Sequence, residues 1–234
     1  MERSRGFSIW QIMNVAAFLI MVIVNLMANI VKFNGKTTAE VSDSIPTLFA
    51  PAGYVFAIWG LIYVLLGAFA VYQALPRNRE RTFISKIGYL FALGSLANVV
   101  WLFLWHYEQI TLSVVLMFVL LGSLIAVYLR LDIGRSDEPR EEKLYVHLPF
   151  SVYLGWITVA SIADVAAALK AAAWDGFGIS EVSLTVIVIA VALVIALIVM
   201  FTRRDVAYGA VIVWALVGII YKQMAVQAIF WAAS

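Results

Sequence analysis

Two charged side chains lie inside apolar runs of this sequence, where they could take part in binding or ion chemistry. Asp164 lies within WITVASIADVAAALK, residues 156–170, and Lys222 lies within the last apolar run. A charge at membrane depth costs about 2.5–3.5 kcal/mol on insertion scales, so such residues usually mark a partner, a ligand or a pathway. Their similar estimated depths predict a buried Asp164–Lys222 ion pair, which would offset part of the desolvation cost. The alternative is that Lys222 extends outward to the polar surface.

Aromatic and polar residues recur at helical spacing around this acid. Tyr153, Trp156, Ala160 and Asp164 are three, four and four residues apart and therefore share one helix face. Faces of this kind are more often packing surfaces than binding sites, but an acid and an amide among the aromatic residues favour an amphipathic ligand pocket. The predicted ligand-binding residues are Phe56, Trp59, Tyr63, Asn98, Trp101, Tyr153, Trp156, Ala160 and Asp164.

The composition is that of a membrane protein. Of 234 residues, 64% are apolar and 13% are charged, whereas a soluble domain carries about 25% charged residues. The absence of cysteine excludes disulfides and thiolate chemistry. No Ser–His–Asp set, metal-ligand cluster or carboxylate pair is visible, so we expect no catalytic or metal site. The expected partners are the lipid bilayer and a small lipophilic ligand, with no nucleic acid.

Seven apolar runs are each long enough to cross about 30 Å of hydrocarbon as a helix. They predict an all-α integral membrane protein that folds as a seven-helix bundle, in one membrane domain. The runs are residues 7–31, 51–75, 86–105, 110–130, 145–172, 182–202 and 207–231.

The basic residues fall mainly on one side of this arrangement. Of the 16 Lys and Arg, twelve lie before the first run or after the second, fourth and sixth runs, and three lie on the other side. This asymmetry predicts a cytoplasmic N-terminus and an outer C-terminus in the cell (plasma) membrane. The twelve are Arg3, Arg5, Arg77, Arg79, Arg81, Lys86, Arg130, Arg135, Arg140, Lys143, Arg203 and Arg204.

The longest outer loop and the first helix carry most of the remaining polar signals. The loop VKFNGKTTAEVSDSIPTLFAPAG, residues 31–53, is predicted to be a lid, with a disordered connector as the alternative. The amides of the first helix form one polar stripe, which we interpret as interhelical hydrogen bonding. Trp105 lies at an outer helix end and is expected to be an interfacial anchor. The stripe consists of Gln11, Asn14, Asn25 and Asn29.

Three blocks of the chain resemble the TspO/MBR family, the tryptophan-rich sensory or translocator proteins. PAGYVFAIWGLIY at 51–63 is similar to the block that opens the second helix of that family. NVVWLFLW at 98–105 and LPFSVYLGWITVASIAD at 148–164 are similar to its blocks in helices three and five. The resemblance covers residues 1–172, which would form a TspO-like five-helix core, and leaves 173–234 as two additional helices packed on that core.

The resemblance implies a cavity beneath the first outer loop that binds a flat lipophilic molecule, such as a porphyrin, another tetrapyrrole or a sterol. No cofactor is required, and a porphyrin or haem-like molecule would be a ligand. Carried over by position, the cavity is lined by Trp59, Asn98, Trp101, Tyr153, Trp156 and Ala160. Asp164 stands where the family usually has Asn, and a carboxylate there could favour a cationic ligand.

Several functions remain open at this point. The resemblance favours a sensory or translocator role. A secondary transporter that uses an Asp164/Lys222 pair is the main alternative, and a retinal-type photoreceptor is a remote one. Enzymatic activity stays open, because porphyrin breakdown is among the activities associated with the family. A homodimer could form through a face of small residues made by Gly88, Ala92 and Ser95.

Overall fold

The computed structural model describes residues 8–224, in which the regular elements are helices and no strand occurs. The longer helices are α1 (Ile9–Met27), α3 (Ile58–Ala74), α5 (Leu90–His106), α6 (Ile110–Arg130), α8 (Leu148–Ala171), α9 (Glu181–Arg203) and α10 (Val206–Lys222). The short ones are α2 (Thr38–Ser44), α4 (Thr82–Ile87) and α7 (Arg140–Glu142), with single turns η1 (Ala28–Lys32), η2 (Phe33–Gly35), η3 (Gly53–Ala57), η4 (Pro76–Asn78), η5 (Lys143–His147) and η6 (Gly176–Gly178).

Within these residues, five helical segments have the length and apolar composition needed to cross a membrane. They are Ile9–Gly35, Gly53–Ala74, Ile110–Arg130, Arg140–Ala171 and Glu181–Arg203. The predicted third and seventh spans correspond to the shorter apolar helices α5 and α10. The end of the predicted seventh span, up to residue 231, lies outside the described residues.

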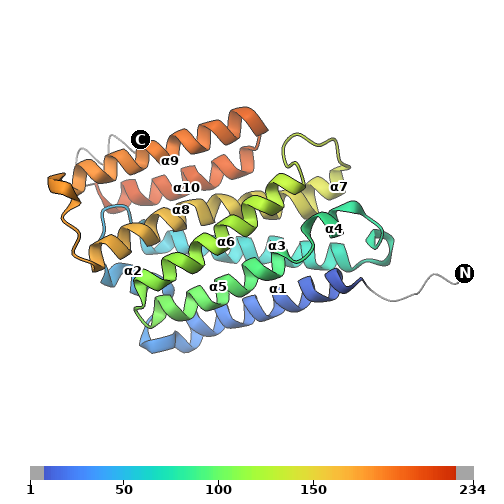
Figure 1. Ribbon diagram of the computed structural model, residues 1–234, viewed down its shortest axis with the longest axis horizontal. Coiled ribbons are helices and arrows are strands. Elements are labelled where there is room, and N and C mark those ends of the chain that lie inside the picture. The colour runs from blue at the N-terminus through green and yellow to red at the C-terminus, as the bar shows by residue number, and fades with distance from the viewer. Residues whose placement is uncertain (1–7, 225–234) are drawn as a thin grey trace, which may run out of the picture.

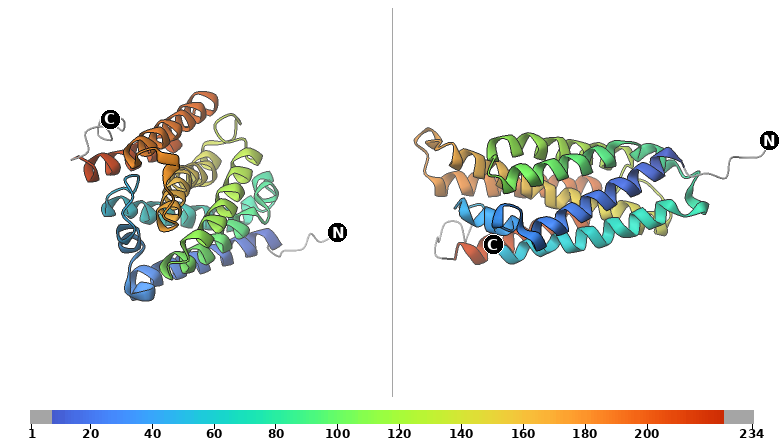
Figure 2. Two further views of the ribbon diagram at one scale, coloured as in Figure 1. Left: turned by 60° about the vertical axis from the view of Figure 1, so that its left-hand side comes forward. Right: turned by 90° about the horizontal axis from the view of Figure 1, so that it is seen from below.

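The long helices run alongside one another in an elongated bundle (Figure 1). α5 packs between α1 and α6, α6 packs against α8, and α10 packs against both α8 and α9. α9 and α10 therefore lie on the side of the bundle away from α1 (Figure 2). α2 lies at the end of the bundle where α8 connects to α9, while α4 and α7 lie at the opposite end (Figure 1).

Three of the four amides of the predicted stripe tie α1 to its neighbours, whereas Asn29 lies in η1, is exposed and donates to the backbone oxygen of Asn25 in its own helix. Gln11 Nε2 donates to the backbone oxygen of Gln73 at 2.5 Å, and Asn14 Nδ2 donates to the Gln73 side-chain oxygen at 3.2 Å. Asn25 Nδ2 donates to Asn98 Oδ1 at 2.7 Å. Because lipid offers no partner for these amides, their pairing fixes which face of α1 points into the bundle.

A close approach between helices seats α10 on α8. A Cβ atom added to Gly155 would lie 3.1 Å from the backbone oxygen of Tyr208 and 3.1 Å from Val211 Cβ, so the glycine leaves the room that α10 occupies. Asp205 caps the N-terminus of α10 by accepting a hydrogen bond from Tyr208 N at 3.1 Å. The two contacts fix the start of α10 against the bundle.

The small-residue face considered for a homodimer packs largely within the chain. Gly88 and Ser95 are buried and Ala92 is half-buried, and α5 is covered by α1 and α6. Close packing of these small residues therefore serves the bundle itself, and the homodimer stays a prediction.

Candidate ligand-binding site

An aromatic cavity lies beneath the first long loop, here called the lid segment (residues 33–52). The cavity, called the lid cavity below, is bounded by the lid segment and by residues of η3, α3, α5 and α8. Its lining consists of Thr38, Ser42, Ile45, Thr47, Ala50, Pro51, Phe56, Trp59, Trp101, Trp105, Trp156, Val159, Ala160, Ala163, Asp164 and Ala167.

Most of the residues predicted from the sequence converge on this cavity. Phe56, Trp59, Trp101, Trp156, Ala160 and Asp164 line it. The other three lie behind the lining. Tyr63 stacks on Trp59 with ring centroids 5.6 Å apart, and Tyr153 packs edge-on against Trp59 at 5.9 Å. Asn98 accepts a hydrogen bond from Asn25. Tyr63 and Tyr153 therefore support the lining, whereas Asn98 links α5 to α1.

Two groups of rings form the cavity walls. On one side, Trp156 packs edge-on against Phe56, with centroids 5.8 Å apart, and against Trp59, at 6.2 Å. On the other side, Trp101 and Trp105 are stacked at 5.8 Å. Edge-on and offset-stacked pairs of this kind hold each other in place and present rigid aromatic surfaces to a ligand.

The structure corrects the role expected for Trp105. This side chain is only 5% exposed and lines the lid cavity, so it is not an anchor at the membrane surface. Its indole nitrogen donates to the backbone oxygen of Thr38 at 3.2 Å. A tryptophan at a helix end sits at the interface only if nothing covers it, and here the lid segment covers it.

The predicted Asp164–Lys222 ion pair is not formed. Asp164 is 2% exposed, and its Oδ1 accepts a hydrogen bond from Ser113 Oγ of α6 at 2.9 Å. Lys222 Nζ instead donates to Asp43 Oδ1 of the lid segment at 2.6 Å and to the backbone oxygen of Pro51 at 3.5 Å. Lys222 is the last residue of α10, at the level of the lid, whereas the sequence placed it well inside a longer helix.

Three buried polar atoms on residues that line the cavity make no hydrogen bond within the chain. They are the indole nitrogens of Trp101 and Trp156 and the Oδ2 atom of Asp164. The two tryptophans are 5% and 2% exposed. Because a buried donor or acceptor without a partner costs about 1–3 kcal/mol, such atoms at a cavity wall indicate a place for a polar ligand group or ordered water.

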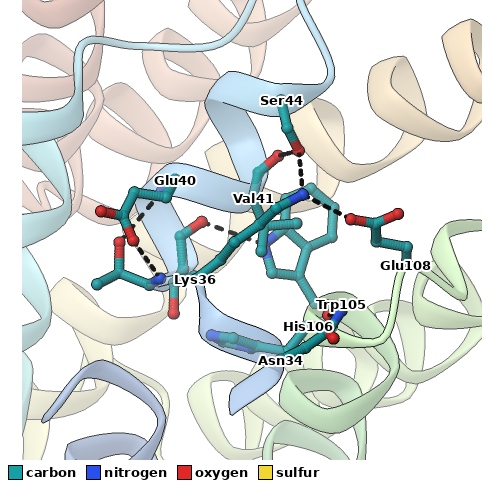
Figure 3. Close-up of polar contacts among 10 residues, drawn as sticks. Asn34, Lys36, Glu40, Val41, Ser44, Trp105, His106 and Glu108 are labelled. Atoms are coloured by element: carbon teal, nitrogen blue, oxygen red, sulfur yellow. Dashed lines mark hydrogen bonds and ion pairs between the residues drawn. The ribbon is translucent and has the colours of Figure 1, made fainter. Parts of the chain in front are cut away.

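One edge of the lid segment is fastened to the end of α5 (Figure 3). Lys36 Nζ forms an ion pair with Glu108 Oε1 at 2.6 Å. Asn34 Nδ2 donates to the backbone oxygen of His106 at 3.0 Å, next to the bond from Trp105 to the lid. Exposed pairs of this type are worth less than about 1 kcal/mol each, so this edge can detach at modest cost.

The other edge of the lid segment is fastened to α10. Besides the Lys222–Asp43 pair, Ala52 N donates to the backbone oxygen of Gly218 at 3.2 Å. Trp214 Nε1 donates to the backbone oxygen of Val55, in the middle of the following η3 turn, at 3.1 Å. The last helix therefore contacts the cover of the cavity and not its polar centre.

The helix of the lid begins with a capping box that predicts a pH dependence. The Glu40 carboxylate accepts hydrogen bonds from Thr37 N at 2.6 Å and from Lys32 Nζ at 3.0 Å. These bonds, that of the Thr37 amide first, lower the pKa of Glu40 from 4.5 to about 2. Because the pKa is depressed in the folded protein, the stabilisation is present above pH 4.5 and is lost as the pH falls towards 2.

Titration of the Glu40 carboxyl carbon by NMR is expected to give a midpoint near 2. In Lys32→Met the midpoint should rise but stay below the ordinary value of 4.5, since the Thr37 amide remains. A wild-type midpoint at the ordinary value would show that the capping box does not form.

The cavity is nearly closed in this conformation. It offers about 40 Å³, room for a few water molecules, whereas pockets for drug-sized ligands measure about 300–1,000 Å³. A flat ring system therefore cannot enter unless the lid segment moves. The fastenings at both edges of the lid thus decide whether the cavity is accessible.

Some lining residues were not singled out from the sequence. Ala163 and Ala167 continue the face of Ala160 on α8, and their small side chains leave the hollow open. Their spacing from Ala160, three and seven residues, was a usable signal. Thr38, Ser42 and Thr47 come from the lid segment. No helical periodicity indicates how this segment packs against the bundle.

Comparison with known proteins agrees with this architecture. The chain matches a family model described as TSPO-like protein over residues 11–234, a region that includes α9 and α10. No curated protein and no solved structure was found to match the chain. With a match over nearly its whole length and five helical segments able to cross a membrane, the chain belongs to the family of TSPO-like membrane proteins.

Proposed function

We propose that this TSPO-like protein binds a flat lipophilic ligand, of the tetrapyrrole or sterol type, in the lid cavity and acts as a membrane sensor or translocator for it. The observation that carries the proposal is the set of unpartnered polar atoms of Trp101, Trp156 and Asp164 on the wall of a buried aromatic cavity. Aromatic walls favour a flat apolar body, and a few convergent polar groups fix its orientation.

The proposal includes the arrangement in the membrane. We place the protein in the plasma membrane with seven crossings, so that α5 and α10 span together with the five longer segments. The N-terminus is then cytoplasmic and the C-terminus outside, because most Lys and Arg lie at the end of the bundle that carries α4 and α7. The lid cavity accordingly opens towards the outer side.

The transporter alternative has lost the feature on which it depended. It required Asp164 and Lys222 to act as a coupled pair, and the two residues have separate partners, Ser113 and Asp43. A binding protein with a movable lid accounts for both residues without ion coupling.

Titration of the purified protein with protoporphyrin is expected to quench tryptophan fluorescence in a saturable manner. Trp156→Ala and Trp59→Ala should each weaken binding about tenfold or more, because each removes a wall of the cavity. Trp174→Ala is the matched control, since this tryptophan is 39% exposed and lies outside the cavity lining. Equal binding by all four proteins would place the porphyrin elsewhere, and the absence of saturable quenching would exclude a tetrapyrrole as the ligand.

A further inference from the structure

The charge of the cavity lining narrows the class of ligand that the proposed function leaves open. Among the residues that line the lid cavity, Asp164 is the one ionisable side chain, and none is Lys, Arg or His. This acid is almost completely buried, and the hydrogen bond that its Oδ1 accepts comes from the neutral hydroxyl group of Ser113. Within the described part of the chain, the cavity therefore has an acid but no cation of its own.

The basic residues that could have neutralised the acid have other partners. Lys222 pairs with Asp43, Lys36 with Glu108, Lys32 with Glu40 and Lys170 with Glu181. An isolated buried carboxylate is costly unless a cation joins it. The cost of burying the Asp164 carboxylate is not offset at the cavity wall, where Oδ2 makes no hydrogen bond. A cation that enters the cavity would offset this cost.

The rest of the lining also suits a positive charge. Five aromatic rings, those of Phe56, Trp59, Trp101, Trp105 and Trp156, surround the space next to Asp164. The faces of such rings attract ammonium groups, tryptophan most strongly, and cages of several rings recognise quaternary ammonium ligands. An aromatic cage with a single carboxylate binds a positive group in two independent ways.

We propose that the ligand of the lid cavity is a lipophilic organic cation, a flat molecule with a protonated or quaternary nitrogen, and that Asp164 is its counter-ion. This inference rests on the proposed function and specifies its ligand. The positively charged nitrogen lies against the Asp164 carboxylate. The flat apolar part extends towards the lid, where Thr38, Ser42 and Thr47 offer hydroxyl groups to a polar edge.

A pair of isosteres tests the charge alone. Trimethylphenylammonium and tert-butylbenzene have the same shape, and only the first carries a charge, which does not depend on pH. We expect the wild-type protein in lipid nanodiscs to bind trimethylphenylammonium at least about tenfold more tightly than tert-butylbenzene, measured by quenching of tryptophan fluorescence. Asp164→Asn keeps the size of the side chain and an acceptor for Ser113, and it should reduce the preference to about twofold or less.

Two further variants complete the test. Asp175→Asn removes an exposed acid outside the cavity lining and should leave the preference unchanged. Trp156→Phe keeps a ring but weakens its attraction for cations, and it should reduce ammonium binding about threefold with little change for the hydrocarbon. This variant also keeps the test valid if Asp164→Asn folds poorly.

The outcomes separate the two proposals. If tert-butylbenzene or protoporphyrin binds in the lid cavity and the ammonium compound has no advantage, the cation inference is overturned and the proposed function stands. An advantage that survives Asp164→Asn would also overturn it, because the charge would then be recognised elsewhere. If none of the three probes binds, the proposed function itself fails.

Discussion

Replacing Asp205 with alanine is expected to lower the free energy of unfolding by about 3–4 kcal/mol, the largest effect of any single change considered for this chain. Asp205 is 6% exposed, and its Oδ2 accepts hydrogen bonds from Tyr128 Oη at 2.9 Å and from Ser151 Oγ at 2.6 Å. Its Oδ1 caps α10 through Tyr208 N. The alanine variant leaves two buried hydroxyl groups without an acceptor and removes the cap.

The measurement is thermal or denaturant unfolding of the purified protein in detergent. Asp205→Asn should lose only about 1 kcal/mol, because one oxygen remains and the two hydroxyl groups can reorient towards the new amide. Asp175→Ala is the matched control, since Asp175 caps the η6 turn through Phe177 N but is exposed, and it should cost about 0.5–1 kcal/mol. Equal losses for Asp205→Ala and Asp175→Ala would mean that the buried network does not stabilise the junction of α6, α8 and α10.

The aromatic part of the site could be predicted because helical periodicity determines it. Trp156, Ala160 and Asp164 lie on one face of α8 by spacing alone, and all three line the cavity. The amide stripe of α1 was interpretable for a similar reason, since an amide in a bilayer must find a partner inside the protein. Where lipid restricts the choices, a single sequence determines the direction of a side chain.

The partner of Lys222 could not be predicted because it depends on where α10 ends and on how the helix is rotated. The sequence indicates how deep a residue lies along a helix, but not towards which neighbour its side chain points. The apolar run to residue 231 also gave no sign that α10 ends at Lys222. Rotation is set by the close contact of α10 with Gly155, which turns Lys222 towards the lid. Asp164 lies on α8 towards Ser113 of α6. Both facts arise from packing between helices far apart in the chain.

The burial of Trp105 had a related cause. A helix-end tryptophan suits the membrane interface equally well, and only the bond from its indole to Thr38 shows that the lid segment covers it. A loop of mixed polarity such as this one has no regular hydrophobic period, so its packing against the bundle cannot be inferred from the sequence. The loop was therefore predictable as a lid, but its contact with Trp105 was not.

A second large effect is expected for Gly218→Ala, which tests whether α10 holds the lid closed. A Cβ atom at Gly218 would collide with Val55 Cγ2 and would lie 3.2 Å from Pro51 Cβ. Val55 is fully buried and its branched side chain has little rotamer freedom, so the backbone must separate instead. Overpacking of this kind costs about 1–3 kcal/mol, and here it falls on the contact between α10 and the end of the lid segment.

The expected consequence is faster hydrogen exchange in the lid segment, above all at Ala52, whose amide bonds to the Gly218 oxygen, together with faster binding of a ligand to the lid cavity. Gly122→Ala on α6 is the matched control, because nothing lies within 4 Å of a Cβ at that position. It should change neither quantity.

The end of α5 still holds the opposite edge of the lid through Lys36 and Glu108, so the lid should open from the α10 side only. If hydrogen exchange became faster along α10 but not at Ala52, α10 would not hold the lid closed. If both rose together, the last helix would control access to the site, since a cavity of about 40 Å³ admits a ligand only when its cover moves.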